Sequence, residues 1–225
     1  MRNLGEIELL SNYSNPDTGI ISNIGSAHVE RLGTLENIAR AKCEIASNLK
    51  PEGIFIGVDS PKIKNHLNYE GKKIYTTLND VKDIDITIDL TKFNYKGENY
   101  AITQPGEYNI SNALLAVEAG LYKGVSVENI KKGLINYKPI EKRWEKTQIG
   151  DFTIINDSYN ASFDSMKAGL KYLSEEIKAK RKIAVLGDMF ELGDFSEELH
   201  RKVGKEVVKK EKATILNSHT IKTKF

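Results

Sequence analysis

Two side chains near the start of the chain, His28 and Lys42, have the chemistry of a ligand-binding site. His28 follows the apolar run 19–24, which predicts a buried strand, and ligands in open α/β sheets bind just beyond the C-terminal ends of strands. Lys42 falls on the apolar face of a helix expected from 35 to 49, where a lysine is unusual because burying its charge without a partner is costly. Each residue also has an ordinary interpretation, the histidine as a loop or core residue and the lysine as one that extends its ammonium to water.

A group of polar residues follows a second expected strand, 152–156. Its members are Asp157, Ser158, Tyr159 and Asn160. At a strand-to-helix turn such side chains, together with backbone N–H groups and the helix dipole, suit contacts to a ribose or a phosphate. An Asx turn followed by a helix cap would use the same residues, so both interpretations stay open.

Two single residues complete the candidate set. Asn109 precedes a helix expected over 113–122, where its amide can donate to and accept from a purine edge, or can simply cap the helix. Arg143 lies in a charged linker, where an isolated arginine is usually solvated and contributes little.

The composition is that of a globular chain of 225 residues, 40% hydrophobic and 28% charged. A net charge of +2 is too balanced to indicate a nucleic-acid or membrane-surface partner. The single cysteine, Cys43, excludes an internal disulfide framework and suits a reducing cytoplasm, and no apolar run approaches the roughly 20 residues of a membrane span. We therefore expect a cytoplasmic protein with no nucleic-acid partner and no membrane partner.

Apolar runs, turns and helix caps predict an α/β protein in two parts. The first part opens with strands and helices in alternation and then changes to short, mostly antiparallel strands over 73–103. A helix capped by Ser126 ends at Lys138-Pro139-Ile140, because the residue before a proline disfavours helical backbone. We place the boundary there and expect domains at 1–140 and 141–225.

Four separated motifs follow one known pattern. They read Asn-Ile-Gly-Ser-Ala-His-Val-Glu at 23–30 with Ala-Lys-Cys-Glu-Ile at 41–45, Tyr-Asn-Ile-Ser-Asn-Ala at 108–113, Asp-Ser-Tyr-Asn-Ala at 157–161, and Gly-Asp-Met-Phe-Glu-Leu-Gly at 187–193. Together they resemble the Mur ligase family, and within it the type that adds D-alanyl-D-alanine. The probability that all four motifs agree in this order by chance is very small.

The resemblance implies a fold and a reaction. The fold would be part of a Mur-ligase central domain, a mostly parallel sheet with helices and a small antiparallel section, followed by a partial Rossmann-like C-terminal domain. The reaction would join D-Ala-D-Ala to UDP-MurNAc-tripeptide in peptidoglycan synthesis, through an acyl phosphate made from ATP, with Mg2+ as the metal.

The resemblance also implies roles for single residues. His28 and a carbamylated Lys42 would hold magnesium, and Arg143 would reach the nucleotide phosphates, which makes these three the expected catalytic residues. Asn109 would contact adenine. The other expected nucleotide contacts are Asp157, Ser158, Tyr159 and Asn160.

Several features depart from the family pattern. Tyr108 stands where a histidine is usual, Lys142 where a glycine is usual, and Phe163 where a proline is usual. The 225 residues contain no G-x-x-x-x-G-K-[ST] phosphate loop. We therefore expect a fragment without the family's N-terminal domain, its phosphate loop and part of its C-terminal domain, inactive on its own.

Two alternative functions are a non-catalytic nucleotide-binding module and a ligase like folylpolyglutamate synthase. The missing phosphate loop favours the first. The second has Asp-Gly-Ala-His-Asn-Pro at the start of its second domain, which disagrees with the residues found at 157–160.

Overall fold

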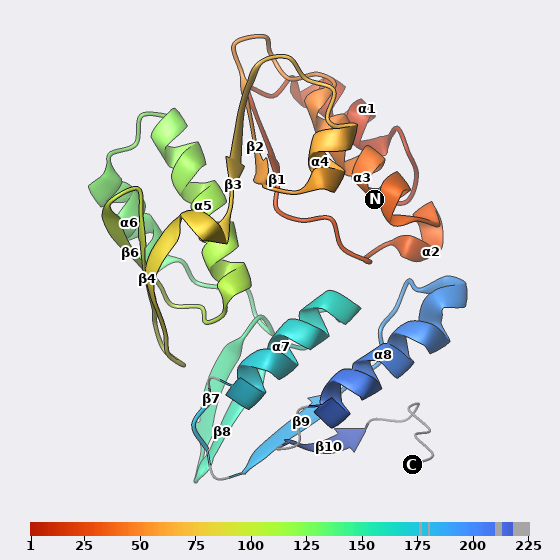
Figure 1. The fold of residues 1–225 in the computed structure, drawn as a ribbon, viewed down its shortest axis with the longest axis vertical. Helices are drawn as coiled ribbons and strands as arrows, with labels where there is room; N and C mark the ends of the chain where they lie inside the picture. The colour runs from red at the N-terminus through yellow and green to blue at the C-terminus, as the bar shows by residue number, and fades with distance from the viewer. Residues whose placement is uncertain (176, 180, 210–212, 218–225) are drawn as a thin grey trace.

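A computed structural model describes residues 1–175, 177–179, 181–209 and 213–217 and shows two lobes (Figure 1). One lobe holds a parallel sheet, a small antiparallel sheet and helices α1 to α6; the other holds α7, α8 and the last four strands. The expected α/β class is confirmed. Within the described residues, no helix is long and apolar enough to cross a membrane.

The parallel sheet has the strand order β1-β2-β3, with every pair parallel. Its strands are β1 (Thr18–Ile21), β2 (Ile54–Val58) and β3 (Lys72–Thr76). Side chains alternate across β2: Ile54 and Ile56 pack toward Leu115 of α5, whereas Phe55 packs in a separate cluster with Ile63. The apolar run of β2 is thus buried on both faces, as in other parallel sheets.

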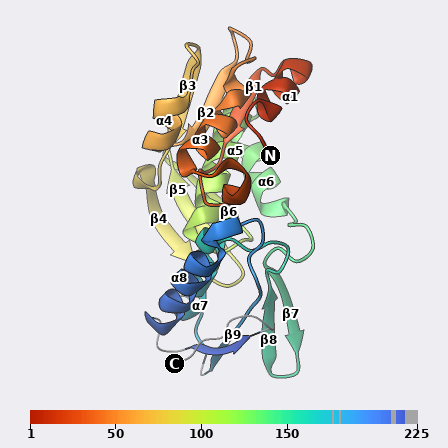
Figure 2. The ribbon, with the colours of Figure 1, turned by 90° about the vertical axis from the view of Figure 1, so that its right-hand side faces the viewer.

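Helices on one face of this sheet carry the first motif (Figure 2). They are α1 (Glu6–Ser14), α2 (Val29–Leu32), α3 (Leu35–Cys43), a 3-10 turn (Glu44–Ala46) and α4 (Pro61–His66). Thr34 caps α3 by accepting a hydrogen bond from the Asn37 N–H at 3.1 Å. The helix expected to reach residue 49 ends at Cys43 as a regular helix, because the Glu44 carboxylate accepts hydrogen bonds from the α1 N-terminus and the chain tightens into 3-10 geometry.

Helix α5 (Glu107–Tyr122) is the central element of the first lobe. One side covers the parallel sheet, and the other packs on an antiparallel sheet with the order β4-β5-β6. The remaining elements there are β4 (Val81–Ile86), β5 (Thr91–Tyr95), β6 (Glu98–Ile102), a 3-10 turn (Leu78–Asp80) and α6 (Val127–Asn136). Of the strands expected over 73–103, β4, β5 and β6 pair antiparallel, as most were expected to, while β3 pairs in parallel with β2. The expected start of the next helix was wrong: α5 begins six residues earlier than residue 113, since Gly106 at φ 98° forms its N-cap.

The second lobe begins with a two-stranded hairpin, of which the sequence predicted only the second strand. Its elements are β7 (Glu145–Ile149), β8 (Phe152–Asn156), α7 (Phe163–Glu175), β9 (Lys182–Leu186), a 3-10 turn (Gly193–Phe195), α8 (Ser196–Lys209) and β10 (Ala213–Asn217). Strand β8 has the expected bounds and pairs with β7, while β9 pairs in parallel with β10. The strand–helix–strand order matches the expected second domain.

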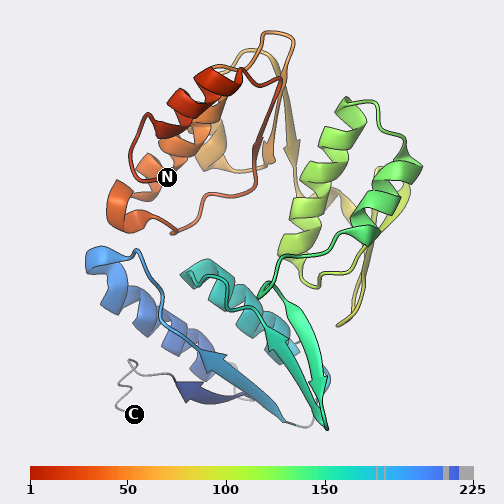
Figure 3. The ribbon, with the colours of Figure 1, turned by 180° about the vertical axis from the view of Figure 1, so that it is seen from behind.

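The two lobes share an apolar cluster. From the first lobe it takes Val29, Leu32, Ile38 and Ala41, and from the second Leu170, Ala184, Met189, Leu192, Val203 and Val207. Burial of these side chains stabilises the junction by removing apolar surface from water. The two lobes face each other at this junction, seen from behind in Figure 3.

Candidate functional site

Residues from two separate segments meet where the linker enters the second lobe. The Trp144 N–H donates to Oδ1 of Asp157 at 3.3 Å, and the Tyr159 N–H donates to the Lys142 carbonyl at 3.1 Å. The Arg143 guanidinium lies over the Tyr159 ring, 4.3 Å from its centroid. The linker and the loop after β8 are thus bonded to each other, and they present a cation and an aromatic face together.

The same cluster extends to the start of α5 through charge. Burial raises the pKa of the Asp157 carboxyl, while the Trp144 N–H and the Arg143 charge oppose that rise. Burial also raises the pKa of Tyr108 to about 12, with a further contribution from the Asp157 charge. The Arg143 charge lowers the pKa of both the Asp157 carboxyl and the Tyr108 phenol. Tyr108, which the family pattern had left without a role, belongs to this cluster.

Asn109 lies in the first turn of α5, beside Tyr108. Its Nδ2 donates to the Pro105 carbonyl at 2.7 Å, which fixes the side chain against the loop before the helix. The helix cap is Gly106, so the interpretation of Asn109 as an N-cap was wrong. The amide is held at the edge of the same junction.

Local hydrogen bonds shape the loop at 157–160. The Asn156 Oδ1 accepts from the Ser158 N–H at 3.3 Å and from the Ser158 hydroxyl at 2.7 Å, which is an Asx turn. Asn160 Oδ1 accepts from the Ala161 N–H at 2.9 Å. An Asx turn is thus present at this loop, but its acceptor is Asn156 rather than one of the residues 157–160. The cap of α7 is made further on, where the Ser162 hydroxyl accepts from the Ser165 N–H at 3.3 Å.

The departures from the family pattern have structural consequences. Lys142 has φ 60° and Trp144 has φ 51°, both in the left-handed region that non-glycine residues rarely adopt. The family glycine at position 142 fits this backbone without strain. Phe163 is the first residue of α7, a position that a proline also tolerates, and its ring packs on the shared apolar cluster.

The loop with His28 lies at a second part of the junction. The Nδ1 atom of His28 is 2.7 Å from Oε2 of Glu191, which belongs to the second lobe. Ser26, on the same loop as His28, contacts α7: Oδ2 of Asp164 accepts hydrogen bonds from the Ser26 N–H at 3.2 Å and from the Ser26 hydroxyl at 3.3 Å. The sequence identified the motifs around His28 and Glu191 separately. Nothing in the sequence predicted that these two residues contact each other, or that Asp164 binds Ser26.

Lys42 reaches the backbone of the loop that carries His28. Its Nζ donates to the Asn23 carbonyl at 2.8 Å, and burial lowers the pKa of the amine. An ammonium cannot ligate a cation. Among the described residues, no three His, Cys, Asp or Glu side chains gather as a metal site would require. The side chains present therefore do not form a magnesium site by themselves, since magnesium requires near-octahedral oxygen coordination.

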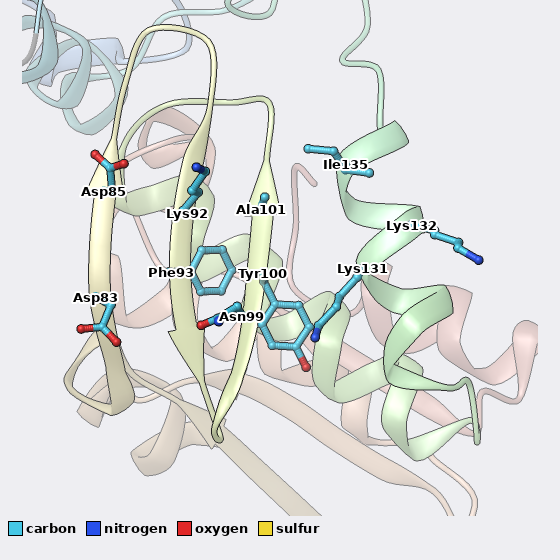
Figure 4. Close-up of a pocket in the computed structure, with 10 residues that line it drawn as sticks. All are labelled: Asp83, Asp85, Lys92, Phe93, Asn99, Tyr100, Ala101, Lys131, Lys132 and Ile135. Atoms are coloured by element: carbon cyan, nitrogen blue, oxygen red, sulfur yellow. The ribbon is translucent and has the colours of Figure 1, made fainter.

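A cavity of about 570 Å³ lies elsewhere, over the antiparallel sheet and α6 (Figure 4). Its floor includes the stacked rings of Phe93 and Tyr100, whose centroids are 5.7 Å apart. Lys131 at its rim is paired with Glu98 at 2.6 Å, and Lys132 points away from the sheet. None of the residues expected to act on a ligand lines this cavity, so the candidate site is the junction of the lobes.

Two family models cover most of the chain. One, described as "Mur ligase middle domain", matches residues 1–120. The other, described as "Mur ligase, glutamate ligase domain", matches residues 142–223. The gap between the two matches contains α6 and the start of the linker.

Individual relatives agree with the models. The UDP-N-acetylmuramoyl-tripeptide–D-alanyl-D-alanine ligase of Bacillus subtilis (strain 168) is 43% identical over 209 residues, which is 89% of this chain and 45% of that protein. A crystal structure of MurF from Acinetobacter baumannii superposes with a TM-score of 0.82 at 25% identity, covering 97% of this chain and 54% of the other. MurF from Thermotoga maritima in complex with ADP has a TM-score of 0.81 at 22% identity, covering 96% and 56%, a likeness of fold alone. The chain thus spans about half the length of the relatives it matches.

Proposed function

The chain belongs to the Mur ligase family, and on that premise we propose that the junction of its lobes is the adenine-nucleotide site of an ATP-dependent ligase. The observation that carries the proposal is the convergence of Asn109, Arg143 and Asp157, from three separate segments of the chain, on one junction. We also propose domains at 1–140 and 141–225, because the linker with Arg143 then connects two parts that each contribute to the site.

Each residue at the junction has a chemistry that suits one part of the nucleotide. The Asn109 amide can both donate to and accept from an adenine edge. The Arg143 guanidinium suits phosphate oxygens, which it binds with charge-assisted hydrogen bonds. The Asp157 carboxylate can accept hydrogen bonds from the ribose hydroxyls. We propose that the other residues of its loop also contact the nucleotide: Ser158, Tyr159 and Asn160.

The reaction we propose for the whole enzyme joins D-Ala-D-Ala to UDP-MurNAc-tripeptide, the reaction named by the relatives. ATP would convert the peptide carboxylate into an acyl phosphate, the amine would attack it, and phosphate would leave. The negative charge that develops on the transferred group is stabilised by cationic side chains, which is the role we assign to Arg143. Lys42 and His28 remain the proposed catalytic pair of the first lobe.

The 225 residues alone contain only part of this machinery. They have no phosphate-loop motif, so nothing in them supplies its backbone N–H groups and lysine to the phosphates. We propose that they bind ADP or ATP weakly, around the millimolar range, and do not turn over substrates. Magnesium would accompany the phosphates, with His28 and a carbamate on Lys42 as part of its coordination shell.

The alternative of a folylpolyglutamate synthase-like ligase is weaker because the motif at 157–160 differs from that family's. A non-catalytic nucleotide-binding module would share the same junction and is the second candidate for the chain by itself. We propose a cytoplasmic location, in keeping with the single buried thiol of Cys43.

Fluorescence titration of the chain with N-methylanthraniloyl-ADP tests the proposal. Arg143→Ala should weaken binding by about tenfold or more, because a hydrogen bond to a charged group is worth about 1.5–3 kcal/mol. Arg201→Ala is the matched control, since Arg201 is an exposed arginine that pairs with Glu197 on the surface of α8. Equal affinity in Arg143→Ala and Arg201→Ala would remove the junction as the nucleotide site.

A further inference from the structure

A contact across the junction joins two motifs that lie far apart in the sequence. Nδ1 of His28 and Oε2 of Glu191 are 2.7 Å apart, although 163 residues separate them along the chain. The His28 side chain is 35% exposed and that of Glu191 is 56% exposed, so both reach the surface of the junction. The 3-10 turn that follows Glu191 lies beside α2, which His28 precedes (Figure 1).

The backbone of Glu191 is held independently of its carboxylate. Its neighbours Met189 and Leu192 are buried in the cluster that also contains Val29. The Glu30 N–H donates to the Glu191 carbonyl at 3.2 Å. Glu191 itself has φ 58°, a left-handed conformation that sets the direction in which its side chain leaves the chain. The carboxylate is therefore delivered to His28 by a docked loop.

We propose that Glu191 is a positioning residue that fixes the tautomer of His28. A neutral imidazole has one N–H and one lone pair, and a carboxylate at hydrogen-bond distance from Nδ1 requires the N–H to be there. The lone pair is then on Nε2, which is left to bind a cation or to accept a hydrogen bond from a ligand. Because Glu191 belongs to the second lobe, docking of the lobes prepares His28 for its ligand.

The importance of this tautomer rests on the proposed function, in which His28 acts in the first lobe. The contact itself does not rest on it. A carboxylate–imidazole pair is a recurrent way to fix a ligating histidine, since the partner determines which nitrogen carries the proton. Here the partner is supplied across a domain junction rather than from the histidine's own lobe.

A second carboxylate of the second lobe, that of Asp164 in α7, provides a matched control. Oδ2 of Asp164 accepts hydrogen bonds from the N–H and the hydroxyl of Ser26, not from the imidazole of His28. Asp164→Ala therefore removes a contact between the lobes while it leaves the partner of His28 in place. Glu191→Ala removes that partner, whereas Glu191→Gln replaces the carboxylate with an amide that can accept from Nδ1–H or donate to an unprotonated Nδ1, and so no longer requires one tautomer.

Long-range 1H–15N NMR of the imidazoles in the whole chain, at about pH 9 where neutral imidazole predominates, reads the tautomer directly. The chain has four histidines, and His28→Gln identifies the signal of His28. We expect the Nδ1–H form to exceed the Nε2–H form by about tenfold in the unaltered chain and in Asp164→Ala, and by less in Glu191→Gln, whose amide can pair with either tautomer. Glu191→Ala should lower that ratio about tenfold.

An Nε2–H tautomer in the unaltered chain would overturn the proposal without recourse to any variant. A ratio that falls equally in Asp164→Ala and Glu191→Ala would also overturn it, because docking in general would then be the cause. The samples contain no nucleotide, so a negative result leaves the proposed nucleotide site untouched. Conversely, a failure to bind ADP would remove the nucleotide site and leave the tautomer result standing.

Discussion

Replacing Lys142 with glycine should stabilise the folded chain, although it removes a long side chain. Lys142 has φ 60°, where an L-residue brings its Cβ close to the following carbonyl oxygen. Its side chain is exposed, so no packing is lost on truncation. The contacts of its backbone, the N–H to Glu145 Oε2 at 3.3 Å and the carbonyl to the Tyr159 N–H at 3.1 Å, remain available to glycine.

The size of the effect follows from two opposing terms. Left-handed backbone costs a non-glycine residue about 1–2 kcal/mol, which glycine avoids. Glycine in turn loses about 0.4–1 kcal/mol more on folding, because its unfolded chain has more conformations. The difference is a gain of about 0.5–1 kcal/mol in the free energy of unfolding. With a urea dependence of about 2.5 kcal/mol/M, the midpoint should rise by about 0.3 M.

Urea unfolding followed by the fluorescence of the single tryptophan measures this change. Glu141→Gly is the matched control, because the neighbouring residue is equally exposed and is not among the left-handed positions of the described chain. It should be destabilised by a few tenths of a kcal/mol or more, since only the entropic term remains. If Lys142→Gly unfolds at a lower urea concentration than the unaltered chain, the linker is not strained at this residue.

Three further results are expected from single positions. Cys43 is 4% exposed, and burial raises the pKa of its thiol to about 11, so at about pH 8 it should react with Ellman's reagent only at the rate of unfolding. Because the unfolded thiol ionises at lower pH than the folded one, this group should favour unfolding as the pH rises from 9 to about 11, and a Cys43→Ala chain should lack that component in pH-dependent urea titrations. Thr34→Ala should lower the free energy of unfolding by about 1 kcal/mol through loss of the cap to the Asn37 N–H, and an unchanged urea midpoint would contradict the cap. Gly193→Ala should lower the free energy of unfolding by about 1–2 kcal/mol, because Gly193 has φ 51° and a Cβ there would lie 3.0 Å from Cγ of Glu30. An unchanged midpoint of thermal unfolding would contradict this contact between the lobes.

Elements with strong local signals were predictable from the sequence. Strand β8 has the expected bounds because its apolar run is flanked by turn residues, and Ser126 caps α6 as its position suggested, accepting from the Asn129 N–H at 3.4 Å. Helix α5 was predicted too short because Pro105-Gly106 and the polar residues after it indicate a loop. In the structure that glycine starts the helix, and the polar residues occupy its first turns.

Features that depend on distant partners were not predictable. Strand β7 is exposed along its whole length and has no apolar alternation, so only its pairing with β8 makes it a strand. The direction of β3 is likewise set by its neighbour β2. The sequence placed candidate residues at strand ends and loops, but which of them meet across the junction, such as His28 and Glu191, depends on how the two lobes dock.

The central claim, that the junction of the lobes binds adenine nucleotide, is tested most directly by a 1H–15N NMR titration of the chain with ADP, to about 10 mM because the expected dissociation constant is near millimolar. The account predicts saturable shifts of the backbone amides of Asn109, Trp144 and Tyr159, from three segments that meet only in the fold. Saturable shifts confined to the cavity around Phe93 and Tyr100, or no shifts at the highest concentration, would contradict it.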